Sequence, residues 1–131
     1  MAVSLHYINE VMNNPPSVLV VDDDPSLRTL LSLALRRAGY TTLTAASGSE
    51  ALDLLASRPV GFLVTDGLME AMDGFELSRR AKHLRPGLHI AMISAVFGAS
   101  DADGGPIERV FEKPAAVSDL VAWLRQFDAR A

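Results

Sequence analysis

Three consecutive aspartates, Asp22, Asp23 and Asp24, follow the apolar run Val18–Val21. Two like charges about 4 Å apart repel by about 1 kcal/mol in water and by about 4 kcal/mol at a partly buried site. A bound cation would remove that repulsion. Asp24 precedes Pro25, and an acidic N-cap followed by proline is a usual beginning of a helix, so we assign Asp24 a structural role. The other two carboxylates remain available for a cation.

A further aspartate, Asp66, follows the apolar segment Phe62–Thr65. A lone aspartate in such a place is most often a helix cap or a turn residue. The carboxyl ends of parallel strands meet at one edge of a sheet, however, which would bring Asp66 to Asp22 and Asp23. Oxygen ligands with room for water suit Mg²⁺. We therefore predict a magnesium site of these three residues, with Asp23 as a direct ligand and Asp22 as a direct or water-mediated one.

Two more polar residues follow apolar segments, Ser94 after Ile90–Ile93 and Lys113 shortly after Val110–Phe111. A serine in such a position is usually a turn former, and a lysine is usually a solvated charge. Beside the Asp66 carboxylate they acquire other roles. The lysine can neutralise an incoming phosphoryl oxygen, and the hydroxyl can form a hydrogen bond to another. The set of residues favours phosphoryl chemistry.

Short apolar segments alternate with helical periodicities along the chain from Ser17 onward. This alternation predicts an α/β fold in which helices cover both faces of a doubly wound parallel sheet. We expect strands at Val18–Val21, Thr41–Ala45, Phe62–Thr65, Ile90–Ile93 and Val110–Phe111. We expect helices at Ser26–Ala38, Ser49–Ser57, Gly74–Leu84 and Ser118–Phe127. The packed face of the first helix is expected to contain Leu27, Leu30, Leu31 and Leu35. The glycine-rich segment Gly98–Pro106 is expected to be a loop with at most a turn of helix.

The composition is that of a single globular domain. The chain has 131 residues, of which 49% are hydrophobic and 21% charged. We divide it into an N-terminal extension, residues 1–16, and a domain, residues 17–131. The net charge of −4 disfavours direct nucleic-acid binding, and the absence of cysteine excludes disulfides and thiolate metal sites. No apolar stretch reaches the length of about 18 residues that a membrane span needs, and no signal-peptide pattern is present, so the cytoplasm is the expected compartment.

Four fragments occur in a characteristic order: VLVVDDDPSLRTLL, TDGLMEAMDG, MISA and FEKP. Through them the chain resembles, from Val18 to about Phe127, the receiver domain of bacterial two-component response regulators. Each fragment alone is weak evidence, whereas the ordered set is specific. The resemblance implies the fold of CheY, a five-stranded parallel sheet with strand order 2-1-3-4-5 and five helices.

The same resemblance implies roles for the polar residues. Asp66 corresponds to the phosphoacceptor, and Asp22 and Asp23 correspond to the acidic pair that binds Mg²⁺. The backbone carbonyl of Leu68 corresponds to a further metal ligand. The remaining positions correspond to the switch hydroxyl, Ser94, and to the lysine of a Lys-Pro pair, Lys113.

The activity implied is that of a signalling receiver whose chemistry is limited to its own phosphorylation and autodephosphorylation. A histidine kinase or a histidine phosphotransfer protein would supply the phosphoryl group. A downstream partner protein or an output domain would read the changed surface. We expect a monomer or a weak dimer that makes no direct contact with nucleic acid or membrane.

Two positions depart from the family pattern. The residue after the loop methionine, commonly proline, is Glu70, and we expect a local change of the loop rather than a loss of chemistry. The switch aromatic usually lies three residues before the lysine, where this chain has Val110. Phe111 is adjacent, but strand alternation predicts that its side chain points to the opposite face of the sheet.

The segment between Ser94 and Lys113 is shorter than is usual and rich in glycine where the fourth helix of the family stands, so we expect that helix to be shortened or disordered. We hypothesise that this segment orders on phosphorylation or partner binding. The positions that tune water access in the family are Leu68 and Val96 here, and their apolar side chains predict slow autodephosphorylation. The Lys113–Pro114 bond is expected to be cis, as it often is in the family.

Two alternative functions remain open from the residues alone. The chain could be a receiver-like binding module that has lost phosphotransfer, since a fold does not fix a function. It could also be a phosphatase of the haloacid-dehalogenase type, which uses an aspartate nucleophile, Mg²⁺, a serine or threonine and a lysine. That second alternative is disfavoured because no acidic pair follows Lys113 at a strand end; Asp119 lies at the start of a predicted helix.

Overall fold

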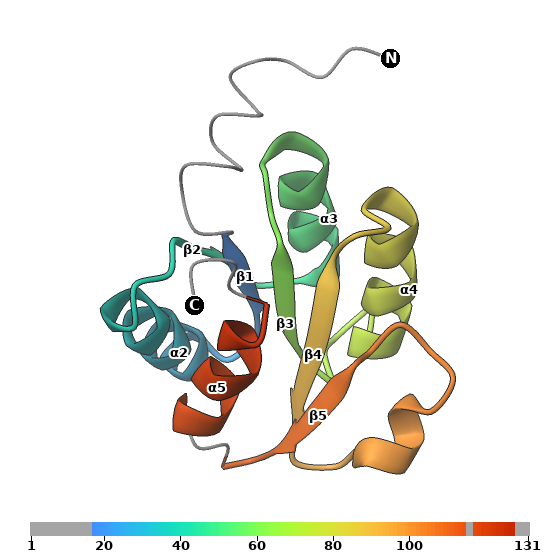
Figure 1. The fold of residues 1–131 in the computed structure, drawn as a ribbon. Coiled ribbons are helices and arrows are strands. Elements are labelled where there is room, and N and C mark those ends of the chain that lie inside the picture. The colour runs from blue at the N-terminus through green and yellow to red at the C-terminus, as the bar shows by residue number, and fades with distance from the viewer. Residues whose placement is uncertain (1–16, 115–116, 128–131) are drawn as a thin grey trace.

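A single five-stranded parallel sheet forms the centre of the molecule in the computed structural model, which describes residues 17–114 and 117–127 (Figure 1). The strands are β1 (Val18–Val21), β2 (Thr42–Ala45), β3 (Phe62–Asp66), β4 (His89–Ser94) and β5 (Arg109–Glu112). Their order is β2-β1-β3-β4-β5, and all four neighbouring pairs are parallel. The predicted fold class and strand order are confirmed.

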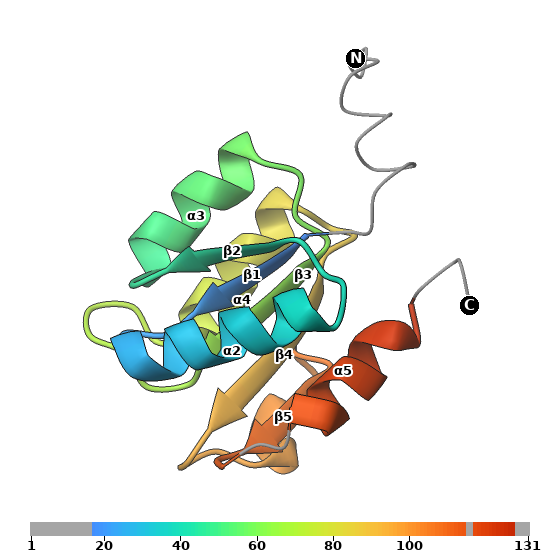
Figure 2. The same cartoon turned by 90° about the vertical axis from the view of Figure 1, so that its left-hand side faces the viewer.

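Helices cover both faces of this sheet. They are α2 (Pro25–Arg37), α3 (Gly48–Ser57), α4 (Gly74–Leu84) and α5 (Val117–Arg125). Figures 1 and 2 show α2 and α5 on one face and α3 and α4 on the other. The predicted elements are all present, with ends that differ from the prediction by at most two residues. The predicted N-terminal extension lies outside the described residues.

The helix ends follow local chemistry. The Asp24 carboxylate accepts hydrogen bonds from the backbone N–H groups of Ser26 and Leu27, and Pro25 takes the first helical position. This confirms the structural role expected for Asp24 and explains why α2 begins one residue before the predicted start. The carboxylate of Asp73 caps α4 in the same way, through the N–H of Glu76.

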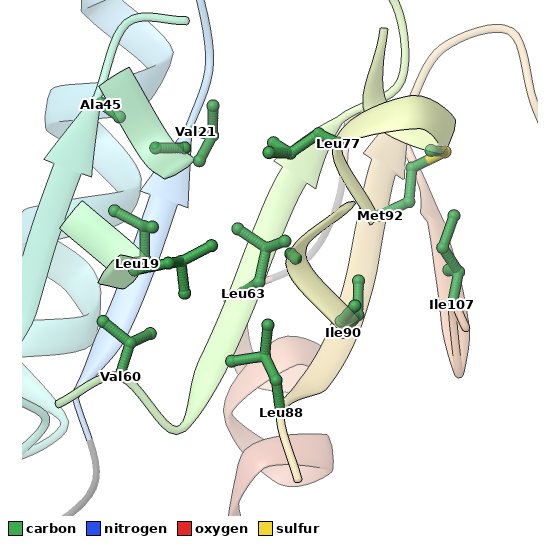
Figure 3. Packing of buried hydrophobic residues seen from close by; sticks show 13 residues of the cluster. Leu19, Val21, Ala45, Val60, Leu63, Leu77, Leu88, Ile90, Met92 and Ile107 are labelled. Carbon is green, nitrogen blue, oxygen red and sulfur yellow. The ribbon is translucent and has the colours of Figure 1, made fainter. Parts of the chain in front are cut away.

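Two apolar clusters, one on each face of the sheet, make up the core. The first lies under α3 and α4 and includes Leu19, Leu63 and Ile90 from three neighbouring strands (Figure 3). The second lies under α2 and α5 and includes Val64 and Trp123. Neighbouring residues of each strand point to opposite faces, and both faces are covered, so the central strands are apolar throughout.

The predicted packed face of α2 is wrong at Leu30. Leu35 is fully buried and Leu31 packs against the second cluster, but the side chain of Leu30 is 59% exposed. On a helix with 3.6 residues per turn, Leu30 lies about 140° around the axis from Leu35. It therefore sits beyond the edge of the stripe that contacts the sheet.

The segment between β4 and β5 contains one short 3₁₀ helix, η1 (Ala99–Ala102), and otherwise forms a loop. This confirms the loop expected over Gly98–Pro106. The described part of the chain therefore has four α-helices, one fewer than the five that the resemblance implied. None of the described helices is long and apolar enough to cross a membrane.

Candidate functional site

Three carboxylates meet at the carboxyl edge of the sheet. Asp66 is the last residue of β3, and Asp22 and Asp23 follow β1 directly. Because β1 and β3 are neighbours with Val21 paired to Thr65, the next residues of both strands emerge side by side. One oxygen from each of the three carboxylates lies within 4.8 Å of the other two. The structure thus brings together the three predicted acids.

The acids differ in burial. Asp22 and Asp66 are 3% and 9% exposed, whereas Asp23 is exposed. Burial raises the pKa of the Asp22 carboxyl above its ordinary value of 3.8, and the charges of Asp66 and Asp23 raise it further. The backbone N–H of Asp24, 2.9 Å from Asp22 Oδ1, and the charge of Lys113 oppose these effects. Such crowding of acids is what a divalent cation would relieve, so the three carboxylates fit a hard cation.

Lys113 provides the positive charge of the site. Its Nζ lies 3.3 Å from Asp66 Oδ1, to which it donates a hydrogen bond, and 3.6 Å from Asp22 Oδ2. The lysine follows β5, and its backbone N–H donates to the carbonyl of Ser94 at 2.8 Å. The peptide bond to Pro114 is cis, as expected. An ammonium group held between two buried carboxylates is well placed to neutralise added negative charge.

The loop after Asp66 folds back against the end of its own strand. The N–H of Gly67 donates to Asp66 Oδ1 at 2.8 Å, and the N–H of Gly74 donates to the carbonyl of Gly67 at 2.9 Å. A Cβ on Gly74 would overlap the carbonyl oxygen of Asp66, so only glycine fits there without a shift. Within the loop, Ala71 has a φ of 66°, next to Glu70, where a local change was expected.

Ser94 ends β4 beside the acids, but its hydroxyl is engaged with its own loop. The Oγ atom accepts hydrogen bonds from the N–H groups of Val96 and Phe97, both at 3.0 Å. It also faces Gly67, where a Cβ in place of the glycine hydrogen would lie 3.1 Å from Oγ. A hydroxyl that accepts can still donate through its own hydrogen. Ser94 therefore lies near the carboxylates, and its hydroxyl hydrogen can still donate a hydrogen bond to a group bound there.

The side chains on β5 lie as strand alternation predicts. Val110 packs against the first cluster, and Phe111 belongs to the second, where its ring centroid lies 6.5 Å from that of Trp123. No aromatic side chain of β5 therefore reaches the face on which Ser94 and the glycine-rich loop lie. Leu68 and Val96 are both exposed, at 53% and 64%.

Two residues near the site were missed by sequence reasoning. Arg28 donates a hydrogen bond from Nη1 to the carbonyl of Asp22 at 2.7 Å. Its position four residues after the N-cap was the available indication, because one helical turn returns the side chain to the strand end. Phe97 packs edge-on against Phe75 of α4, with ring centroids 4.8 Å apart. It lies in a loop without periodicity, so no pattern pointed to it.

Residues 18–125 match the response regulator receiver domain family. The response regulator receiver protein CpdR of Brucella abortus is 37% identical over 107 residues, which cover 79% of this chain and 89% of that protein. The transcriptional regulatory protein GlrR of Escherichia coli is 35% identical over 99 residues, which cover 76% of this chain but 22% of GlrR. The chain thus spans about a fifth of the length of that longer relative.

The fold is also similar to solved structures. One is a response regulator protein from Burkholderia pseudomallei, solved with a phosphorylated aspartic acid, a calcium ion and citrate. The TM-score is 0.74 at 26% identity, with 83% of this chain and 66% of that chain covered.

Proposed function

The chain belongs to the response regulator receiver domain family, a signalling module of two-component systems, and from this premise we propose that it accepts a phosphoryl group on Asp66. The observation that carries the proposal is the meeting of a buried Asp66 with two further carboxylates and the ammonium group of Lys113. A related response regulator protein with a phosphorylated aspartic acid supports the same chemistry.

In the proposed reaction an Asp66 carboxylate oxygen attacks the phosphorus of a phosphohistidine on the donor protein. A new P–O bond forms as the P–N bond breaks, and the imidazole nitrogen keeps the electron pair and takes up a proton from solvent. Lys113, already within hydrogen-bonding distance of Asp66, neutralises charge on the transferred group. The Gly67 N–H fixes the orientation of the attacking carboxylate through its bond to Oδ1.

The metal would be held by Asp22, Asp23 and Asp66, with the carbonyl of Leu68 as the further ligand that the family resemblance implies. When bound, Mg²⁺ would offset the repulsion between the carboxylates and the incoming phosphoryl oxygens. Arg28 would support this arrangement indirectly, because its bond to the Asp22 carbonyl holds the loop that carries both leading acids.

After transfer, the Ser94 hydroxyl would donate a hydrogen bond to a phosphoryl oxygen and bias its loop toward a second arrangement. The donor would be a histidine kinase or a histidine phosphotransfer protein. The changed surface would be read by a downstream partner protein or by an output domain.

Intact-mass measurement after incubation with acetyl phosphate, with and without Mg²⁺, tests the proposal. The wild-type protein is expected to gain one phosphoryl group in a Mg²⁺-dependent manner, and Asp66→Asn is expected to gain none. Asp73→Asn is the matched control. Asp73 is an exposed aspartate of the same loop, and its carboxylate caps α4. It should gain the group as the wild-type protein does.

Two results would contradict the proposal. An equal gain by Asp66→Asn would place the acceptor at another residue. No gain by the wild-type protein from acetyl phosphate, with Mg²⁺ binding established by titration calorimetry, would favour a donor-restricted receiver or a receiver-like binding module. No gain from a phosphohistidine protein either would contradict the proposal and leave the binding module.

A further inference from the structure

The ring of Phe97 lies between the proposed acceptor and α4. It is half-buried, packs against the first cluster and meets the ring of Phe75 edge-on, with an interplanar angle of 86°. Edge-to-face aromatic pairs of this kind contribute about 0.5–1.5 kcal/mol beyond the area that they bury. The pair therefore joins the loop after β4 to the first turn of α4.

The same ring also lies against the residue that follows the acceptor. A Cβ on Gly67 would approach Phe97 Cδ2 to 2.8 Å, so the ring occupies the space beside the Gly67 backbone. Gly67 is buried, and its N–H is the group that donates to Asp66 Oδ1. The ring thus packs one residue from the carboxylate that would be phosphorylated.

The backbone of Phe97 is held by Ser94. The Oγ atom accepts hydrogen bonds from the N–H groups of Val96 and Phe97 and so fixes the turn from which the ring projects. If the Ser94 side chain changes rotamer to donate to a phosphoryl oxygen on Asp66, Oγ itself moves away from these two amides. The position of the ring therefore depends on what the hydroxyl binds.

Phe75 also lines a cavity of about 230 Å³ between α4 and the segment that includes the end of η1. Its other lining residues lie on α4, at Arg79, and along the stretch Asp101–Ile107. A ring that leaves Phe75 would free one wall of this cavity. The surface of α4 and of the loop between β4 and β5 would then change shape together.

We propose that Phe97 couples the state of Asp66 to this surface. Phosphorylation draws the Ser94 hydroxyl toward Asp66, the Val96 and Phe97 amides are released, and the Phe97 ring moves off Phe75. The coupling passes through the loop after β4, because Val110 and Phe111 of β5 provide no aromatic ring on this face. This inference rests on the proposed phosphorylation of Asp66.

The test is hydrogen exchange measured by mass spectrometry, with beryllofluoride and Mg²⁺ as a mimic of the phosphoryl group. In the wild-type protein the mimic should change exchange rates by about threefold or more across residues 96–107 and the first turn of α4. Phe97→Leu should bind the mimic but lose the change in α4. Phe75→Leu should lose the same change, and the double variant should show no further loss, because both rings act as one pair.

Phe111→Leu is the matched control, since it shortens an aromatic side chain on the opposite face of the sheet, and it should respond as the wild-type protein does. Phe97→Tyr keeps the aromatic ring and should respond as the wild-type protein does. Far-UV circular dichroism checks that each variant is folded. A full α4 response in Phe97→Leu or Phe75→Leu would overturn the inference, as would an equal loss in Phe111→Leu. The proposed function fails separately, if the wild-type protein shows neither a phosphoryl adduct nor bound beryllofluoride.

Discussion

Asp22 is the residue at which the requirements of chemistry and of folding conflict most directly. It is 3% exposed, and burial together with the charges of Asp66 and Asp23 raises the pKa of its carboxyl. The folded protein therefore holds a proton on Asp22 more tightly than the unfolded chain does. As the pH rises from 3.8 through the raised pKa, the free energy of unfolding therefore falls relative to that of a protein without this acid.

Replacing Asp22 with Asn should therefore stabilise the metal-free protein. The amide oxygen can still accept the bond from the Asp24 N–H, while the charge repulsion is removed. We expect the free energy of unfolding at neutral pH to rise by about 1 kcal/mol. We also expect the free energy of unfolding of Asp22→Asn to fall less than that of the wild-type protein as the pH rises above the ordinary carboxyl range. Urea denaturation at several pH values, with a chelator present, measures both effects.

The control is Asp53→Asn, which removes an exposed carboxylate on α3 and should change the free energy of unfolding by less than about 0.5 kcal/mol. Added Mg²⁺ should stabilise the wild-type protein more than Asp22→Asn. A loss of stability in metal-free Asp22→Asn, larger than in Asp53→Asn, would contradict this account.

At the scale of elements, the approach of α4 to the end of β3 depends on Gly74. A Cβ at this position would overlap the Asp66 carbonyl oxygen and lie 2.9 Å from Met92 Cε. The nearest obstacle is backbone, so the helix start or the strand end must shift. The first turn of α4 and the proposed acceptor are thus held in one packing arrangement.

Gly74→Ala should lower the free energy of unfolding by about 1–3 kcal/mol, as overpacking does, and should slow phosphorylation of Asp66 by acetyl phosphate. The matched control is Gly87→Ala, because a Cβ on Gly87 meets nothing within 4 Å. It should stay within about 0.5 kcal/mol of the wild-type protein. Equal stability and equal phosphorylation rates in both variants would contradict the packing argument.

At the scale of the whole molecule, one sheet is shared by two apolar clusters. Leu63 points into the cluster under α3 and α4, whereas Trp123 lies in the cluster under α2 and α5. Both clusters need the same strands in place, so the protein should unfold in a single transition.

Leu63→Ala should lower the free energy of unfolding by about 2–5 kcal/mol, because Leu63 is fully buried in the central strand. Leu33→Ala, at a side chain that is 48% exposed, is the control and should cost less than about 0.5 kcal/mol. Urea transitions followed by Trp123 fluorescence and by far-UV circular dichroism should coincide in all three proteins. A Trp123 transition unaffected by Leu63→Ala would mean that the two faces unfold independently.

The arrangement of the fold and the set of acids were accessible from the sequence because both depend on local or periodic features. Apolar strands alternating with capped helices predict a parallel sheet, and a parallel sheet brings the residues that follow its strands to one edge. Asp22, Asp23, Asp66 and Lys113 were predicted on that ground and do lie together. The caps at Asp24 and Asp73 were equally local.

The remaining features depend on how the elements and loops pack against one another, which the local patterns did not settle. Leu30 is exposed because the stripe of α2 that contacts the sheet is narrower than the apolar pattern of the helix. The hydrogen bond from Arg28 to the Asp22 carbonyl forms only once α2 has folded back against the end of β1. The contacts of Phe97 with Phe75 and Gly67 arise where the loop after β4 packs against the first turn of α4 and the loop after β3. Sequence determined which groups reach the site, whereas tertiary packing decided which neighbours hold them.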